Sequence, residues 1–589
     1  MASDGSVDSG LNSTTCTEAS TNSIASTDGS DDEEFHDAES SFSPANVKRG
    51  ERMKTADAVI EMYRAIDLFL DNRFEEAKAL AEPWAPVSMY HALALGVLNF
   101  LHAFLSAEAE PIERAIVSLR HARKLANTKR RQQNAIKSVS SWFLGKDFAS
   151  FTDDEKAAEL IYTECLLLRG VITFLQDEGL ISFARGGLRI RACYKSYKEC
   201  YDLMSTSGRC DHEFAQGVKY GFGTFNLAMS LLPARVLQLL EFIGYSGDRG
   251  LGLKLLNDCA YAESLRAFSA RLVLLTFHTI IPYMLGLGDG DIEEATKLIT
   301  TNLTKYPNGA LFLFFKGRLL VIEGSMADAE EWLCRSVACQ KQWPQLHHLC
   351  YWEIFWSHCF RQNWLKASDF AETLFKESRW SKSSYLYMQA ATLLMDADPK
   401  SDQYTKASAL MKKIPGHKIR IAGRSVPFEK FAIERHDRFL RKGHLFLPAV
   451  EMAYMMWSGF TVLARNQELL EKMYTYVSRA ASQDVSDDPD DHCLAELLLG
   501  VCLRCSGKVD EGLAKLQDML QYAINSGVEN AYLQPYCHVE IGLCFMKLEQ
   551  YNEARKHFDI ARTNFKKYAL QSRLHFRMHA ALRTFPADT

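Results

Sequence analysis

Proline is scarce in this chain, which has only 15 prolines among its 589 residues. Strand-like alternation of apolar and polar residues is also almost absent after about Lys54. An interior proline breaks a helix, and alternation with a period of two marks a half-buried strand, so both absences leave long helices uninterrupted. The body of the chain is therefore predicted to be all-α.

The first 47 residues contain no lysine or arginine. The acidic residues that precede Lys48 are Asp4, Asp8, Glu18, Asp28, Asp31, Asp32, Glu33, Glu34, Asp37 and Glu39. Subtracting these ten negative charges from the formal net charge of −5 leaves about +5 on the remainder, an excess that does not call for a nucleic-acid partner. A segment so charged and so poor in large apolar residues cannot offset its ordering entropy. Residues 1–50 are therefore predicted to form a disordered, Ser/Thr-rich acidic tail that is open to phosphorylation.

The sequence shows no apolar leader, and its 15 cysteines are scattered and odd in number. Scattered, unpaired cysteines are typical of reduced thiols rather than of a disulfide framework. We therefore expect a cytoplasmic protein.

Sequence motifs for catalysis are also missing: there is no nucleophile elbow, no HExxH and no phosphate-binding loop. Gly217, Gly221 and Gly223 lie close together, but no strand leads into them, so they predict close helix packing rather than a nucleotide site. The chain is predicted not to be an enzyme, with no catalytic residue, no cofactor and no metal site.

One segment does concentrate soft metal ligands, namely His347, His348, Cys350, His358 and Cys359. Zinc sites use such ligands, usually in pairs placed on turns. Here the ligands lie in a continuous helical pattern whose spacing fits none of the closed tetrahedral arrangements. We therefore favour a packed helix over a zinc site.

Two long apolar runs stand out, MSLLPARVLQLLEFIG at 229–244 and LVLLTFHTIIPYMLGLG at 272–288. The second run carries no formal charge, but it is only about 17 residues long and contains His278 and Pro282, at the lower limit for a membrane span. A buried helix is the favoured interpretation, and no transmembrane span is expected. The runs leave open a lipid-handling function, in which they line a cavity or enter one leaflet of a membrane.

A repeated helix pair is clearest near the C-terminus. In IGLCFMKLEQYNEARKHFDIA, Gly542 and Ala554 are twelve residues apart, and Phe558 and Ala561 follow. Small residues let two antiparallel helices approach, and aromatic residues fill the space that remains, as in a tetratricopeptide repeat.

The same spacing recurs at Gly317 and Ala329, and in weaker form at Gly500 and Gly512. The interval from Gly500 to Gly542 exceeds the regular repeat of about 34 residues. We therefore predict an irregular TPR-like α-solenoid, curved or partly closed on itself, with one helical repeat region at 51–300 and a second at 301–589.

Four segments carry a resemblance to a known family. They are ECLLLRGVITFLQDEGLISFARGGLRIRACYKSYKEC (164–200), GVKYGFGTFNLAMSLLPARVLQLLEFIGYSGDRGLGLKLL (217–256), YPNGALFLFFKGRLL (306–320) and HHLCYWEIFW (347–356). The chain resembles the tetratricopeptide repeat protein 39 family, to which the fungal inclusion-body clearance proteins are related. The resemblance implies a repeat scaffold without established enzymatic activity, linked to protein quality control, lipid handling and organelle surfaces.

The acidic tail contains one candidate recognition motif, made of Glu34, Phe35, His36, Asp37, Ala38 and Ser40. It resembles the FFAT motif (two phenylalanines in an acidic tract) that binds VAMP-associated proteins of the endoplasmic reticulum. Glu34, Phe35, Asp37 and Ala38 fit that pattern, whereas His36 replaces the second aromatic residue. Ser40 stands where an acidic residue is usual, and its phosphorylation would restore the charge.

Two basic stretches are candidates for an acidic partner or an anionic membrane. The first comprises Arg185, Arg189, Arg191, Lys195 and Lys198. The second comprises Lys418, Arg420, Arg424, Lys430, Arg435, Arg438 and Arg441. We favour solvated helix faces for both.

Together these features predict a non-catalytic scaffold that binds proteins in its concave surface and is tethered to the endoplasmic reticulum by its tail. It would act in lipid homeostasis or protein quality control and could associate peripherally with membranes. The alternatives are a lipid-handling protein and an adaptor in ubiquitin-dependent degradation.

Overall fold

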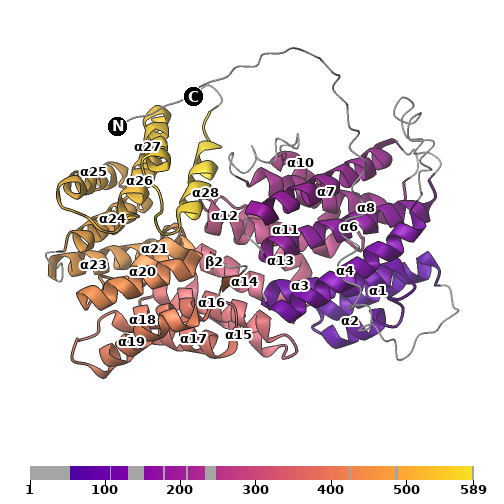
Figure 1. The fold of residues 1–589 in the computed structure, drawn as a ribbon, viewed down its shortest axis with the longest axis horizontal. Coiled ribbons are helices and arrows are strands. Elements are labelled where there is room, and N and C mark those ends of the chain that lie inside the picture. Colours follow the sequence, from indigo (N-terminus) through magenta and orange to yellow (C-terminus); the bar gives the residue numbers. More distant parts are fainter. Residues whose placement is uncertain are drawn as a thin grey trace, which may run out of the picture. The chain divides into compact units, whose positions relative to one another are not determined.

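The computed structural model describes residues 53–106, 108–130, 151–176, 180–206, 210–232, 247–418, 420–421, 424–425, 427–483 and 488–586, without the side chains of 173–189, 420–421, 424–425 and 483. All of these residues belong to one compact unit, Arg49–Thr589. The fold within this unit is all-α, as the sequence predicts (Figure 1).

The N-terminal helices are α1 (Thr55–Leu70), α2 (Phe74–Ala81), α3 (Met89–Ser106), α4 (Ala109–Lys129), α6 (Asp153–Gln176), α7 (Leu180–Thr206), α8 (His212–Ser230), α10 (Arg249–Ala260), α11 (Ala267–Thr279), α12 (Ile281–Leu285) and α13 (Ile292–Lys305). The middle helices are α14 (Ala310–Glu323), α15 (Met326–Ala338), α16 (Pro344–Phe360), α17 (Trp364–Glu377), α18 (Lys382–Leu394), α19 (Asp402–Lys413) and the 3-10 helix η3 (Ile414–His417). The C-terminal helices are α20 (Pro427–Lys442), α21 (Pro448–Trp457), α22 (Gly459–Leu463), α23 (Gln467–Gln483), α24 (Pro489–Cys505), α25 (Val509–Asn525), α26 (Leu533–Lys547), α27 (Tyr551–Thr563) and α28 (Gln571–Leu582).

Among the described residues, the one β pairing joins two-residue strands in the basic insertion. Strand β1 (Arg420–Ile421) pairs antiparallel with β2 (Arg424–Ser425).

Local sequence signals set many of the helix ends. Asp211, Asp248 and Asp291 cap α8, α10 and α13, each accepting a hydrogen bond from a backbone N–H three residues later at 2.9 to 3.0 Å. Such caps satisfy one of the free N–H groups at a helix start. At the end of α14, Gly324 adopts a left-handed φ of 84°, which glycine reaches without steric strain.

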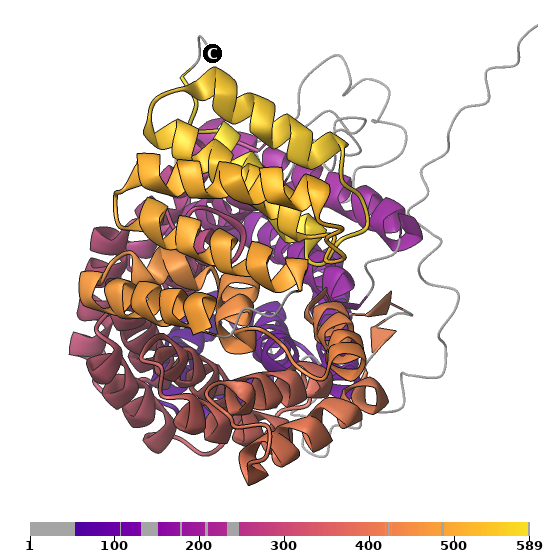
Figure 2. The ribbon, with the colours of Figure 1, turned by 90° about the vertical axis from the view of Figure 1, so that its left-hand side faces the viewer.

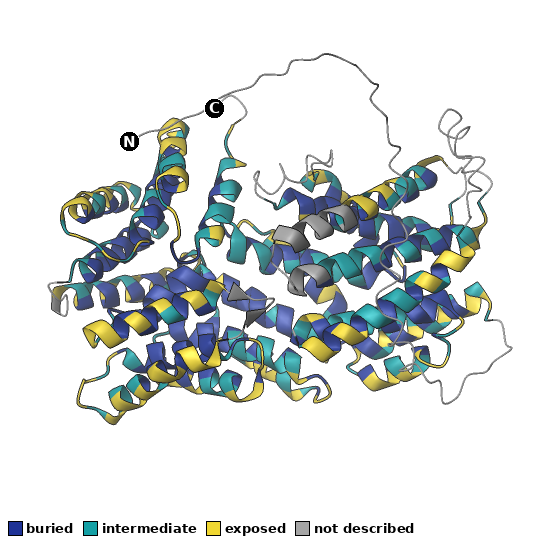
Figure 3. Ribbon diagram, viewed as in Figure 1, coloured by how far each residue is buried: buried dark blue, intermediate teal, exposed yellow. Residues whose placement is uncertain are grey.

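The helices form an inner row and an outer row. In α24, an inner helix, 13 of 17 residues are buried, whereas the next helix, α25, buries only Gly512, Leu516, Met519 and Ala523 (Figure 3). Spacings of four, three and four place these four residues on one face. Helices α14, α16, α18 and α26 belong to the inner row, and α15, α17, α19 and α27 belong to the outer row.

Distant parts of the chain come together inside the unit. Phe69 and Phe74, at the end of α1 and the start of α2, pack on Trp343, which precedes α16, with ring centroids 5.6 and 4.6 Å apart. Helix α12 contacts α28, and the Arg583 guanidinium donates a 2.5 Å hydrogen bond to the Ser230 carbonyl. The solenoid therefore closes on itself, and Figure 2 shows the helices following this curved path.

Candidate functional site

The residues predicted to form the repeat seams lie between paired inner and outer helices. A β-carbon at Gly317 would lie 2.5 Å from Leu333 Cγ, and one at Gly500 would lie 2.7 Å from Leu516 Cγ. Ala329 is fully buried in the same seam as Gly317. The structure thus places α14 against α15 and α24 against α25 so closely that a β-carbon at either glycine would force the facing leucine to shift.

The C-terminal repeat has the same construction. Gly542 on α26 faces the ring of Phe558 on α27, and Ala554 and Ala561 are fully buried beside it. These residues set the spacing between the two helices.

The glycines of α8 also pack closely, as predicted. A β-carbon at Gly217 would lie 2.3 Å from Leu160, and one at Gly221 would lie 2.1 Å from the ring of Tyr197. Gly223 faces the Gly252 carbonyl of α10.

The inner row is covered by the chain's own helices. All ten residues of α21 are buried, and α21 and α22 together contact α14, α16, α18 and α24. At the end of α21, the Trp457 ring stacks on Trp356 and meets Trp352 edge-on, with centroids 6.3 and 5.4 Å apart. In this region, the concave surface predicted to bind partners is therefore covered by the chain's own helices α21 and α22.

A buried ion pair lies next to Trp457 of α21. Arg318 on α14 donates from Nη1 to Glu353 Oε2 on α16 at 2.9 Å, and its guanidinium lies over the rings of Tyr283 and Trp457. Both charged side chains are almost completely inaccessible to solvent. The pair joins two consecutive inner helices to α12 and α21.

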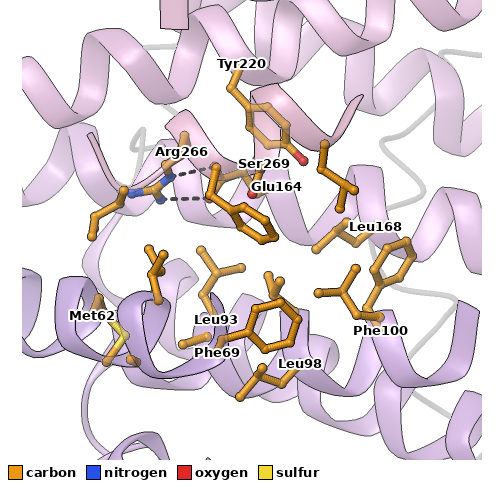
Figure 4. Close-up of a pocket in the computed structure, with 18 of the residues that line it drawn as sticks. Met62, Phe69, Leu93, Leu98, Phe100, Glu164, Leu168, Tyr220, Arg266 and Ser269 are labelled. Carbon is orange, nitrogen blue, oxygen red and sulfur yellow. Dashed lines mark hydrogen bonds and ion pairs between the residues drawn. The ribbon is translucent and has the colours of Figure 1, made fainter. Parts of the chain in front are cut away.

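A different feature, an apolar cavity of about 230 Å³, lies among the N-terminal helices (Figure 4). Its walls come from α1, α3, α6, α8, the start of α11 and the residues just before α11. The residues that line it are Met62, Ala65, Ile66, Phe69, Tyr90, Leu93, Ala94, Val97, Leu98, Phe100, Leu101, Glu164, Leu167, Leu168, Tyr220, Leu265, Arg266, Phe268, Ser269, Leu272 and Val273. The lining is thus mostly apolar and holds a few convergent polar groups, as in small-molecule sites.

The polar groups of the cavity are dominated by one ion pair. Arg266 donates from Nε and Nη2 to Glu164 Oε1 and Oε2, at 3.0 and 2.9 Å, and both side chains are buried. Burial opposes the charge on Arg266, but the Glu164 carboxylate holds the Arg266 pKa above its usual range. Burial also raises the pKa of Tyr90 to about 12, so this phenol is neutral at physiological pH.

Two helices of the described chain, α3 and α11–α12, are long and apolar enough to cross a membrane by composition alone. Half of each apolar window is buried, as is usual for core helices of globular proteins. The predicted buried run at 272–288 includes buried Leu274, Leu275 and Tyr283, while Leu272 and Val273 line the cavity. Both apolar helices thus contribute to one cavity.

The other sequence predictions have mixed outcomes. The tail motif Glu34–Ser40 lies outside the described residues. The His/Cys segment forms α16, in which Cys350, His358 and Cys359 are buried, and the described residues contain no group of three or more potential metal ligands.

The prediction of solvated basic faces is wrong for two arginines of α20. Arg435 and Arg438 are buried, because Arg435 pairs with Glu451 at 3.0 Å and Arg438 with Asp490 at 2.6 Å. A carboxylate partner offsets the cost of burying each guanidinium, and no local sequence pattern indicates these partners on other helices. Lys195 and Lys198 of the first stretch are exposed, as predicted.

Sequence reasoning missed the cavity and its ion pair. Glu164 and Arg266 are separated by 102 positions, so no local pattern connects them. The one available signal was a lone carboxylate in the apolar run ECLLL, which needs a partner once its helix is buried.

Comparisons with known proteins agree with these repeats. A family model described as Iml2/Tetratricopeptide repeat protein 39 matches residues 63–506. Tetratricopeptide repeat protein ttc-39B of Caenorhabditis elegans is 31% identical over 555 residues, which cover 92% of this chain and 95% of that protein.

Two solved structures align along most of the chain. The Cut9–Hcn1 hetero-tetramer of the APC/C gives a TM-score of 0.23 at 12% identity, covering 89% of this chain and 96% of the other. The Naa15/Naa10 complex bound to HypK-THB gives a TM-score of 0.20 at 11% identity, covering 90% and 92%. At these low scores neither chain superimposes on this one as a whole.

Proposed function

The chain belongs to the Iml2/tetratricopeptide repeat protein 39 family, and we propose that it is a non-catalytic scaffold for protein–protein interaction. The observation that carries the proposal is the construction of the seams, in which Gly317, Gly500 and Gly542 bring paired helices together. Stacked helix pairs of this kind present extended surfaces for partners. The charged groups buried along the inner row are used in structural ion pairs such as Arg318–Glu353.

Partners of the scaffold bind its outer surface rather than the inner row, because α21 and α22 cover much of the inner row. Large apolar side chains remain accessible on outer elements: Leu365 on α17 is 59% exposed and Ile524 on α25 is 76% exposed. Single exposed apolar residues are common, but they supply anchor points for a partner.

The acidic tail tethers the scaffold to the endoplasmic reticulum through its FFAT-like motif. Phe35 fills an apolar pocket of a VAMP-associated protein, Asp37 accepts charge-assisted hydrogen bonds, and Ala38 fills a shallow pocket that rejects larger side chains. A segment predicted from its composition to be disordered must order on binding, so we expect an affinity near micromolar, about −8 kcal/mol.

A pull-down with the receptor domain of a VAMP-associated protein tests the tether. Wild type is recovered, Phe35→Ala and Ala38→Trp are not, and Ser40→Glu is recovered more strongly because it supplies the missing acid. Equal recovery of all four proteins would eliminate the tether and leave the scaffold proposal standing.

Affinity capture with mass spectrometry tests the scaffold itself, using the full chain and a chain without residues 1–46. Both should recover one shared set of partners, and only the full chain should recover membrane receptors. Ligase components in the shared set would favour a role in ubiquitin-dependent degradation, and chaperones would favour protein quality control. An empty shared set would contradict the scaffold.

The apolar cavity favours a second candidate, a lipid-handling function. Its walls include parts of both helices that are long and apolar enough to cross a membrane, and Leu272 and Val273 come from the run that first suggested this function. Lipid extraction and mass spectrometry of the purified protein would find a stoichiometric lipid in a lipid-handling protein and none in a simple scaffold.

A further inference from the structure

The cavity has one apolar side and one side that carries its polar groups. In Figure 4, Met62, Leu93 and Leu98 lie on one side, and Glu164 and Arg266 lie on the other. Ser269 and Tyr220 accompany the ion pair. An occupant would therefore place an apolar body against α1 and α3 and a small polar group toward α6, α8 and α11.

The cavity is large enough for an occupant bigger than a single small ring. At about 230 Å³ it exceeds the engineered apolar cavity of about 150 Å³ that binds benzene. An apolar ligand gains dispersion contacts with walls that otherwise have no partner atoms. A flexible hydrocarbon chain suits both the volume of the cavity and its apolar walls.

The ion pair decides the charge of the occupant. Two hydrogen bonds tie the Arg266 guanidinium to Glu164, so their charges cancel at the cavity wall. A second carboxylate, Glu213, also interacts with Arg266 and accepts a 3.0 Å hydrogen bond from the Leu265 backbone. A carboxylate or phosphate ligand would have to approach Arg266 against these two acids.

An exposed aromatic residue lies next to the cavity lining. Phe100 lines the cavity, and the Phe104 ring stacks on it with centroids 6.1 Å apart while remaining 51% exposed. An exposed aromatic ring stacked on a lining residue gives a hydrophobic molecule a place to contact the protein close to the cavity.

From the apolar walls, the volume and the cancelled charge, we propose that this cavity binds one uncharged amphiphile, a hydrocarbon chain that ends in a hydroxyl group. The inference rests on the lipid-handling candidate and narrows its ligand to neutral lipids. The hydroxyl hydrogen-bonds among Ser269, Tyr220 and the Glu164 carboxylate, and the chain lies between α3 and α11.

Isothermal titration calorimetry of the full chain at about pH 8, with 1-dodecanol and dodecanoate as probes, tests the charge preference. One dodecanol binds per chain, and dodecanoate binds at least about tenfold more weakly, a difference of about 1.4 kcal/mol. Equal affinities, or tighter binding of dodecanoate, would overturn the proposal.

Cavity-filling variants test the location. Ala94→Phe and Leu168→Trp each place extra atoms inside the cavity from different helices, so each should lose dodecanol binding. Ala56→Phe adds the same ring at an exposed position of α1 and should bind like wild type. Circular dichroism establishes that each variant is folded, and retained binding in a folded filled variant would place the site elsewhere.

A variant that changes the charge at the cavity wall tests whether the ion pair sets the ligand preference or has only a structural role. Glu164→Gln keeps a hydrogen-bond acceptor for Arg266 but removes the cancelling charge, so the affinity ratio should shift at least about tenfold toward dodecanoate. An unchanged ratio in this variant would refute the role of the ion pair.

Partner capture by Ala94→Phe should match wild type, so failure of the scaffold and failure of the ligand site give different results.

Discussion

Gly542 on α26 faces Phe558 on α27 so closely that a β-carbon at position 542 would lie 2.4 Å from ring atom Cε1. Real β-carbons essentially never approach another heavy atom within 3.0 Å. Phe558 is itself buried, so its ring cannot swing into solvent without losing its contacts in the core. The distance between these two helices is therefore set by the absence of one methyl group.

Gly542→Ala should consequently destabilise the protein by about 1–3 kcal/mol, the usual penalty for overpacking a core. The midpoint of urea unfolding measures the change. Gly170→Ala is the matched control, because Gly170 is also helical but a β-carbon there would have no neighbour within 4 Å among the described residues, and it should stabilise by about 0.5–1 kcal/mol. If both variants shifted the midpoint equally, close packing at the seam would not be the cause.

The buried pair Arg318–Glu353 should respond differently to single and double replacement. Glu353→Leu leaves a buried guanidinium without its carboxylate and should cost about 3–5 kcal/mol. The double variant Arg318→Met, Glu353→Leu replaces both charges by apolar groups and should recover most of that loss. Urea unfolding of wild type, the single variant and the double variant measures both effects. If the double variant were no more stable than Glu353→Leu, apolar packing would not make up for the loss of the ion pair.

The charge on His444 should make stability depend on pH. His444 Nε2 lies 2.8 Å from Asp491 Oδ2, and this hydrogen bond raises the pKa of His444. The pair also faces Arg438 and Lys442, which lie near the same acidic cluster. A raised folded-state pKa means that the contribution is complete below the unfolded pKa of about 6.5 and is lost as the pH rises through the folded pKa.

The comparison of wild type with His444→Gln follows from this sign. The stability advantage of wild type should be largest at about pH 6 and should shrink as the pH rises toward 8. Thermal unfolding in a series of buffers measures the advantage. An advantage that grows with pH would mean that His444 is stabilised in its neutral form.

Arg573 should hold α28 against the helices that fill the inner row. Its Nε donates to the Met284 carbonyl at 2.9 Å, its Nη2 donates to Ser458 Oγ at 2.5 Å, and its Nη1 donates to the Met455 carbonyl. Burial lowers the pKa of Arg573 to about 10, so the guanidinium remains charged at neutral pH. Ser458 has a left-handed φ of 51°, and the hydrogen bonds from Arg573 secure this strained junction between α21 and α22.

Arg573→Ala should therefore cost about 3 kcal/mol and increase amide hydrogen exchange in α28 and at the junction of α21 and α22. Arg562→Ala is the control, because Arg562 is half exposed and its ion pair within the described part of the chain is with Asp559 on its own helix. Exchange that rises equally in both variants would argue against a specific clamp.

The family, the all-α class and the repeat character could be predicted from the sequence, because a helix pair is encoded locally. Gly542 and Ala554 are twelve residues apart, and that interval alone predicts two helices and the seam between them. The prediction for α20 failed in part because an arginine that will be buried looks like one that will be solvated until its partner is known. Arg438 meets Asp490 and Asp491 about 50 positions later.

The sequence by itself thus determined the elements and their nearest-neighbour packing, which depend on side chains a few residues apart. The tertiary structure alone decided how the solenoid closes, how α21 and α22 fill the inner row, and how five separate helices enclose the apolar cavity. Those features depend on contacts such as Glu164 with Arg266, 102 positions apart, and Arg573 with Met284, 289 positions apart. The physical reason is that packing energy depends on distance in space, and no periodic pattern along the chain records which distant surfaces will meet.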